Sequence, residues 1–314
     1  MRTIPTTLGH VESTKLGKVN SHDHIILDGS KNKHIPEDFH HTDIALIAAE
    51  LKEWFDAGGG AIIDCSPLGA GRNITLLEET SKKSGVPIIA SSGFHKTNYY
   101  NKDHWIYSTS TDELIKIVDK ECTEGLLFHP EDPAKPERSG ITAGILKLGV
   151  GAEGFTPIIK NLFVVIADVM KRRTIPAMIH TERGVHFREL ISLCKYIGMP
   201  PDKTIICHMG KSFDRNLHTL LAEEGFFLEF DEMVRPDPLL SDLADEIRFL
   251  FDLGYSNQIL FAGDLARRSY WKCYQGGPGL SYLITDLSQK LISLGITRKM
   301  LNQIWEINPR KLFS

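Results

Sequence analysis

The stretch ITAGILKLGV, residues 141–150, is apolar on both faces, which is typical of a strand buried in a parallel sheet. Similar short runs recur along the chain, and each is followed by a segment with helical periodicity. They are KVNSHDHI (18–25), AIIDCSP (61–67), PIIASSGF (87–94), PAMIHT (176–181), TIICHMG (204–210), FFLEFDE (226–232) and QILFAGD (258–264). Eight such strands alternating with helices predict a closed parallel (β/α)8 barrel, an α/β fold of the TIM-barrel class.

The segments between these runs carry helix-end signals. Thr42 can cap a helix over residues 42–58, Thr111 can cap one over 111–125, and Thr156 followed by Pro157 opens a third. A doubly wound open sheet is the alternative fold. It is disfavoured because no G-x-G-x-x-G turn follows the first run.

The composition is that of a folded protein without a strong overall charge. The 314 residues are 42% apolar and 24% charged, with a formal net charge of −4. This balance gives no general attraction to nucleic acid or to an anionic membrane, and the sequence has neither a signal-peptide core nor an 18-residue apolar run. Five widely spaced cysteines are typical of reduced thiols. We predict a cytoplasmic enzyme in which residues 1–314 form one domain, with insertions after the first and third strands.

Four histidines are predicted to meet at the carboxyl ends of the strands, where such a barrel carries its active site. His22 and His24 are two residues apart on one strand and therefore point to the same face, while Asp23 points away. His180 and His208 end two later strands. Each can be a hydrogen-bonded core histidine, but four imidazoles converging on one barrel mouth favour a metal site.

Two further residues fall at the same end of the barrel. Asp264 follows the apolar run ILFAG, where a carboxylate is poorly solvated unless it ligates a metal or accepts hydrogen bonds. Lys147 interrupts an apolar strand with no room for a solvated ammonium. It can be a Schiff-base lysine, a lysine that extends past the barrel rim, or an amine that captures carbon dioxide to form a carbamate bridging two metals. The histidines favour the carbamate, N6-carboxylysine.

At these residues the sequence resembles the phosphotriesterase family of the amidohydrolase superfamily. The resemblance extends along nearly the whole chain through HDHIILD, GILKLGVG, HTE, ICHM, FAGD, GGPGLSYL and NPRKLF. It implies a (β/α)8 barrel with two divalent metals, usually zinc. His22, His24 and Asp264 would hold the buried metal, His180 and His208 the exposed one, and carboxylated Lys147 would bridge them. Asp23 departs from the glutamate that the family usually has there.

Within that family, GDLARRSYWKCYQGGPGL (263–280) looks most like the phosphorylated-sugar lactonases. Loops after the seventh and eighth strands of such barrels commonly bind phosphate, and arginine binds phosphate bidentately. Arg235, Arg267 and Tyr270 match the positions that bind the substrate phosphate in that branch, and Lys96 and Arg268 are further candidates. The alternative is that these arginines pair with nearby acids, which are Asp231, Glu232 and Asp237.

The predicted function is hydrolysis of a phosphorylated sugar lactone, a small molecule, by a metal-bridging hydroxide, with Asp264 as the proton-transferring group. The metals are predicted to be zinc, with manganese or cobalt as alternatives. Four other functions remain open: a phosphotriester or phosphodiester hydrolase, a lactonase for unphosphorylated lactones, a Schiff-base aldolase, and a phospho-sugar binding protein without activity. A homodimer is implied by the resemblance alone.

Overall fold

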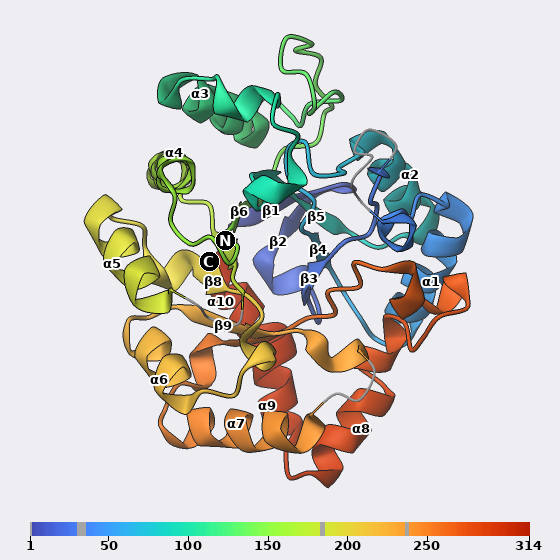
Figure 1. Ribbon diagram of the computed structural model, residues 1–314. Helices are drawn as coiled ribbons and strands as arrows, with labels where there is room; N and C mark the ends of the chain where they lie inside the picture. The colour runs from blue at the N-terminus through green and yellow to red at the C-terminus, as the bar shows by residue number, and fades with distance from the viewer. Residues whose placement is uncertain (1, 30–35, 183–185, 236–238) are drawn as a thin grey trace.

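The computed structural model describes residues 2–29, 36–182, 186–235 and 239–314 (Figure 1). Its main sheet has eight strands that pair in parallel in chain order, and each lies within one of the predicted runs. They are β3 (Asn20–Asp23), β4 (Ile62–Asp64), β5 (Ile88–Gly93), β6 (Ile145–Gly149), β7 (Ala177–His180), β8 (Thr204–Ile206), β9 (Phe227–Phe230) and β10 (Ile259–Phe261). The predicted (β/α)8 barrel is confirmed.

The first and last strands of the sheet, β3 and β10, are joined by three hydrogen bonds. Two of these three bonds are accepted by side chains of β3, and all three are donated by the segment that follows β10. They run from Gly263 N to Asn20 Oδ1 (3.0 Å), from Asp264 N to the His22 carbonyl (2.9 Å) and from Leu265 N to Asp23 Oδ1 (3.1 Å). The polar side chains of the H-D-H strand thus help to close the barrel.

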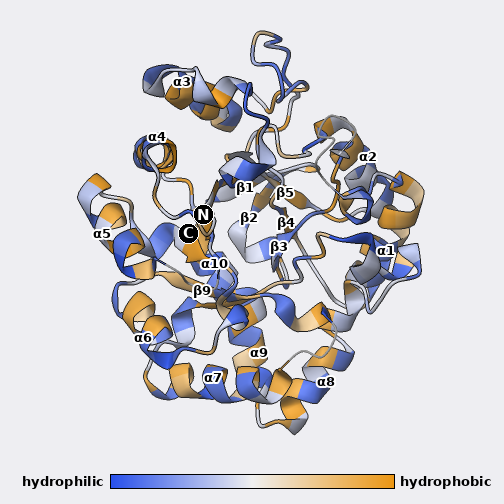
Figure 2. Cartoon of the chain, viewed as in Figure 1, coloured by the Kyte–Doolittle hydropathy of each residue, from blue (hydrophilic) through white to orange (hydrophobic). Residues whose placement is uncertain are grey.

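A helix follows each strand and covers the outside of the barrel (Figure 1). Figure 2 shows hydrophobic and hydrophilic residues side by side along these helices, as expected when one face packs on a sheet. They are α1 (Ile44–Asp56), α2 (Ile74–Ser84), α3 (Thr111–Thr123), α4 (Pro157–Arg173), α5 (Phe187–Ile197), α6 (Arg215–Glu223), α7 (Leu240–Asp252) and α8 (Asp286–Ser293). None of the helices in the described part of the chain is long and apolar enough to cross a membrane.

The helix caps differ in part from the prediction. Asp43, not Thr42, caps α1, because its carboxylate accepts hydrogen bonds from two backbone N–H groups of the first turn. Ser110, not Thr111, caps α3 by accepting from the N–H of Glu113. Thr156 caps α4 as predicted.

The barrel interior has an apolar floor and a polar layer above it. Along β6, Ile145 belongs to the cluster inside the barrel, whereas Leu146 and Leu148 pack toward the helices. Lys147 lies two residues after Ile145 and therefore points inward as well. In the same way, Met178 precedes His180 on β7. The strand repeat thus puts Lys147 and His180 one layer above the apolar floor.

The amino end of the barrel is covered by segments that the sequence patterns did not predict. β1 (Thr3–Thr6) and β2 (Gly9–Glu12) form an antiparallel hairpin, and α10 (Asn308–Phe313) ends the chain beside it. Ile4 and Phe313 belong to the same buried cluster as the inward residues of the barrel strands. These segments leave the opposite, carboxyl end as the mouth.

A buried ion pair joins the segment before α2 to α3. The Arg72 guanidinium binds the Glu121 carboxylate through both terminal nitrogens (2.9 and 2.5 Å), and Ser92 Oγ donates to the same carboxylate (2.6 Å). Both charged side chains are almost fully buried. Neither charge can be solvated by water if the other is removed.

We expect Glu121→Ala to lower the free energy of unfolding by about 3–5 kcal/mol, because it leaves the Arg72 guanidinium buried and unpaired. The control is Asp56→Ala, which removes an exposed i,i+4 pair with Lys52 and should cost at most about 1 kcal/mol. Urea denaturation midpoints of both variants measure the difference. Equal midpoints would show that the buried pair contributes no more to the free energy of unfolding than the exposed pair does.

Candidate metal centre

The six residues predicted as metal ligands lie together at the carboxyl ends of the strands. His22 is on β3, His24 is the first residue after that strand, Lys147 is on β6, and His180 ends β7. His208 and Asp264 follow β8 and β10, and both have positive φ. All six side chains are buried, and five of them, with Lys147 beneath, line a cavity of about 230 Å³.

One nitrogen of each imidazole faces the other predicted ligands. His180 Nδ1 lies 2.6 Å from His208 Nε2. His22 Nε2 lies 3.2 Å from Lys147 Nζ and 3.8 Å from Asp264 Oδ1, and His24 Nε2 lies 3.7 Å from the same oxygen. Nitrogen and oxygen donors converging in this way suit a divalent cation.

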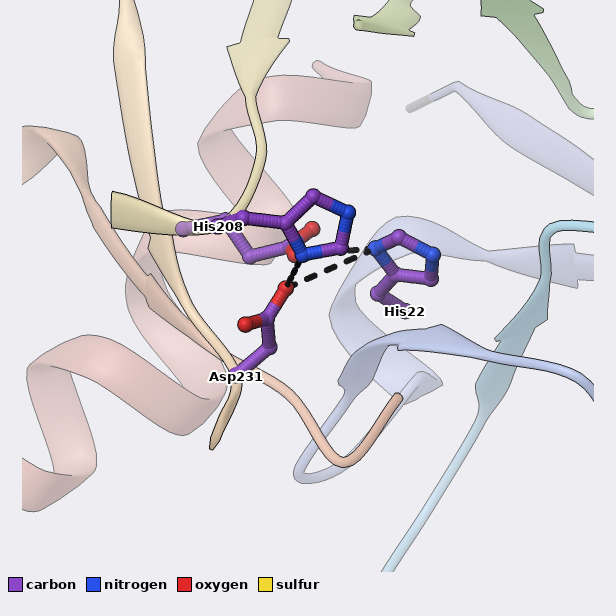
Figure 3. Close-up of side chains that lie close together, drawn as sticks. His22, His208 and Asp231 are labelled. Atoms are coloured by element: carbon purple, nitrogen blue, oxygen red, sulfur yellow. Dashed lines mark hydrogen bonds and ion pairs between the residues drawn. The ribbon is translucent and has the colours of Figure 1, made fainter. Parts of the chain in front are cut away.

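The other nitrogen of each imidazole has a polar partner that fixes the ring. In three cases this partner is a carboxylate, which is the usual way in which proteins orient metal-binding histidines. The pairs are His22 Nδ1 with Glu229 (2.9 Å), His208 Nδ1 with Asp231, His180 Nε2 with Glu182 (3.2 Å), and His24 Nδ1 with Ser66 Oγ (3.1 Å). Figure 3 shows the Asp231 carboxylate beside His208, with the His22 ring also close to it.

Among the described residues, two groups of side chains have donor atoms close enough to hold one ion. One consists of His22, His24 and Asp264, and the other of His22, His208, Glu229 and Asp231. The second group uses the Nδ1 side of both imidazoles. We interpret its carboxylates as ring-orienting groups, because the Nε2 side of the same rings faces the cavity and the remaining candidate ligands.

Burial keeps three of the candidate imidazoles, those of His22, His24 and His180, neutral, which is the form that binds metal. Desolvation, helped by the positive charge of Lys147, holds the pKa of His22 and of His24 well below the usual range. Desolvation and the neighbouring His208 do the same to the pKa of His180. These rings therefore need to lose no proton when a metal binds near neutral pH.

The carboxyl groups of Glu229, on β9, and Asp231, directly after it, differ in their protonation state. Burial and the adjacent Asp231 raise the pKa of Glu229 well above its ordinary value. Burial would also raise the pKa of Asp231, but the charge of His208 and its hydrogen bond lower it. Asp231 is thus the ionised member and Glu229 the protonated one.

Lys147 experiences opposing effects. Burial lowers the pKa of its amine, and nearby Cys207, Cys65, Glu229 and Asp264 raise it, with a net rise. Burial raises the pKa of both thiols well above neutrality, so they carry no charge there, and protonated Glu229 carries none either. Of these four groups, Asp264 alone favours the ammonium. Positive metal charge close to Nζ would reverse this balance and favour an anionic carbamate.

The three predicted phosphate-binding residues line the same cavity. Arg235 pairs with Asp264 Oδ2 (2.5 Å) and Glu232 Oε1 (3.1 Å), and its guanidinium lies 5.6 Å from the Tyr270 ring centre. Arg267 lies over the Phe39 ring at 4.7 Å. Arg235 therefore makes acid contacts of the kind weighed as the alternative.

The other candidates are placed differently. Lys96 lines the cavity, whereas Arg268 is not among the described residues of its wall and pairs instead with Glu37 at 3.6 Å. Asp237, weighed as an arginine partner, lies outside the described residues.

Sequence reasoning missed several residues around the site. Glu229 and Asp231 alternate in FFLEFDE with the same two-residue spacing as H-D-H, and that spacing is the signal that would have placed them on the inward face. His95 follows β5 and lines the cavity, although it was assigned no role. Lys211, after His208, also lines it, and its loop position gave no comparable signal.

The chain is similar to known proteins along nearly its whole length. Residues 2–313 match the sequence model of the phosphotriesterase family. The chain is 29% identical to a phospho-furanose lactonase of Mycoplasmopsis synoviae, over 98% of this chain and 91% of that protein. The crystal structure of an amidohydrolase from Mycoplasma synoviae superposes with a TM-score of 0.89 at 29% identity, covering 99% of this chain and 92% of the other. A lactonase from Listeria monocytogenes gives 0.87 at 26% identity, covering 100% and 99%.

We expect Asp231→Ala to weaken Zn²⁺ binding by about 10- to 100-fold, because the His208 ring loses the carboxylate that orients it. Titration of metal-free protein against a chromophoric chelator measures the affinity directly. The matched control is Glu246→Gln, which alters a buried carboxylate bound to His218 Nδ1 (2.7 Å) between α6 and α7. An unchanged Zn²⁺ affinity in Asp231→Ala would show that this carboxylate does not orient the His208 ring for metal binding.

Proposed function

The chain belongs to the phosphotriesterase family, and from this membership we propose that it is a binuclear metal-dependent hydrolase that opens a phosphorylated sugar lactone. It is a hydrolase of ester bonds; the two metals and the substrate are the proposal. The observation that carries it is one cavity of about 230 Å³ whose wall combines the converging histidines with Arg235, Arg267 and Tyr270.

The metal ligands in this proposal are the six converging side chains. His22, His24 and Asp264 would hold one ion and His180 and His208 the other, with Lys147 as N6-carboxylysine between them. The orientation of the four rings supports the fit, because one nitrogen of each ring is held by a polar partner and the other faces the remaining candidate ligands. Two ions, zinc, manganese or cobalt, would supply Lewis acidity to the lactone carbonyl and lower the pKa of water.

Asp264 is the proton-transferring group. Its carboxylate lies within 4 Å of His22 Nε2 and His24 Nε2 and faces the cavity, so it is placed to accept a proton from the attacking water. The same carboxyl can then return the proton to the ring oxygen that departs when the lactone opens. Its positive φ and the hydrogen bond from its N–H to the His22 carbonyl hold it at this point.

The phosphate of the substrate is the proposed ligand of the arginine side of the cavity. Arginine forks match the geometry of a phosphate, and the Tyr270 hydroxyl adds a neutral donor. Arg235 already contacts Asp264, so the phosphate and the reacting carbonyl would be held by neighbouring groups. The similarity to two phospho-furanose lactonases, each 29% identical over nearly the whole chain, supports this substrate class.

The direct test is a turnover screen of metal-loaded protein on phosphorylated pentono- and hexonolactones, with unphosphorylated lactones and a paraoxon-type triester in parallel. Preferential opening of phosphorylated lactones supports the proposal. Faster hydrolysis of the triester makes the protein a phosphotriesterase. Calorimetric binding of phosphorylated lactones without any product would favour a sugar-phosphate binding protein.

We expect Asp264→Asn and Arg267→Ala to separate chemistry from phosphate binding. Loss of the proton-transferring carboxylate should lower kcat by about 10²- to 10⁴-fold on every lactone. Loss of the guanidinium should lower kcat/KM by about 10- to 100-fold on phosphorylated lactones and change unphosphorylated ones little. Steady-state kinetics on a matched pair of lactones measures both. An equal loss on the two lactones after Arg267→Ala would contradict the phosphate role.

A further inference from the structure

The wall of the cavity also contains an ion pair that the proposed chemistry does not use. Lys96 Nζ lies 2.5 Å from Glu182 Oε1, and both side chains line the cavity. Their side chains are 13% and 33% exposed, so the pair is shielded from bulk water but reachable from the cavity. Lys96 also lies over the Tyr99 ring, 5.6 Å from its centre, which limits the directions its ammonium can take.

Lys96 lies across the mouth from Arg235, and Glu182 is its partner there. Lys96 follows β5 and Glu182 follows β7, whereas Arg235 and Arg267 follow β9 and β10. In a closed barrel with the strand order β3 to β10, β5 is four strands from β9 in either direction, which is the opposite side (Figure 1). The converging histidines lie between the two sides and line the same cavity.

The charges of the pair suit a hydroxyl group better than a phosphate. Lys96 Nζ and Glu182 Oε1 form an ion pair at 2.5 Å, so a positive and a negative group face the cavity side by side. An anionic phosphate would be attracted by Lys96 and repelled by Glu182. A hydroxyl can instead accept from the ammonium and donate to the carboxylate at the same time, which makes two charge-assisted hydrogen bonds.

We propose that Lys96 and Glu182 recognise the 2-hydroxyl of the lactone ring and thereby select hydroxylated lactones. The inference rests on the proposed function. With the carbonyl carbon C1 at the histidines and the phosphate-bearing side of the ring toward the arginines, C2 is the ring carbon next to C1 on the far side. Its hydroxyl is therefore the ring substituent directed toward the β5 and β7 loops. Glu182 has a second contact, with His180 Nε2, so Lys96 is the cleaner position to test.

The test compares a phosphorylated 1,4-lactone with its 2-deoxy analogue on metal-loaded protein. The unaltered protein should prefer the hydroxylated lactone by about 10- to 100-fold in kcat/KM, because the deoxy compound cannot form the two charge-assisted hydrogen bonds to the ion pair. Lys96→Met keeps the apolar stem and should lose most of this preference by slowing the hydroxylated lactone while leaving the deoxy analogue nearly unchanged. Glu182→Gln should reduce the preference in the same direction.

The matched control is Lys160→Met, which removes an exposed ion pair of Lys160 on α4 with Glu189 on α5 (3.1 Å). It should leave the preference intact. Metal content, measured for every variant, shows whether Glu182→Gln acts through His180 instead.

The outcomes separate this inference from the proposed function. Turnover of both lactones at equal rates by the unaltered protein overturns the hydroxyl site and leaves the lactonase standing. An equal loss on both lactones in Lys96→Met overturns it as well, because the pair would then act on folding, on the metals or on the phosphate. Absence of any lactone turnover overturns both proposals together.

Discussion

The candidate site depends on how the first strand of the barrel meets the last. The contact is made by three N–H groups after β10 that donate to the side chains of Asn20 and Asp23 and to the His22 carbonyl. One of the three donors belongs to Asp264. Residues 242 positions apart in the chain are thereby fixed within one hydrogen bond of each other. Any slip of β10 along β3 would separate the Asp264 carboxylate from the two imidazoles that it faces.

The polar layer above the floor costs stability, because it removes charged and polar groups from water. Hydrogen bonds and ion pairs among these groups offset this cost. Each predicted metal-binding histidine has a partner on its distal nitrogen, and Asp231 stays ionised beside His208, whereas its neighbour Glu229 takes up a proton. Where ligands face one another, as at His180 and His208, the site is arranged for an additional positive charge.

Much of the architecture could be predicted from the sequence because it depends on patterns within single segments. Each of the eight runs contains one strand of the barrel, and the spacing of H-D-H correctly put His22 and His24 on one face. Helix caps were displaced by one residue, since Asp43 and Ser110 compete with an adjacent threonine for the same N–H groups. The amino-terminal hairpin has short strands with mixed polarity and gave no periodic signal.

The surroundings of the site were harder to predict, because they depend on contacts between distant segments. Strand-end position brought the six predicted ligands to one place, but it could not say that Arg235 contacts Asp264 or that Glu182 contacts Lys96. Those contacts join loops of different strands. Asp23 was interpreted as facing away from the site, and it does, yet its role in joining β3 to the segment after β10 becomes visible only when the barrel is closed.

The alternation of floor and site along each strand has a consequence for how such a protein can change. On β6, Ile145 seals the interior and Lys147 enters the site, and the same two-residue step separates Met178 from His180. The pleat therefore fixes the height of Lys147 and His180 above the floor, independently of the loops that follow their strands. Mutations at loop positions such as Lys96, Arg235 and Arg267 can alter which molecule is admitted without moving these two side chains. Substrate preference can therefore change at some positions of the chain while the chemistry is kept by others.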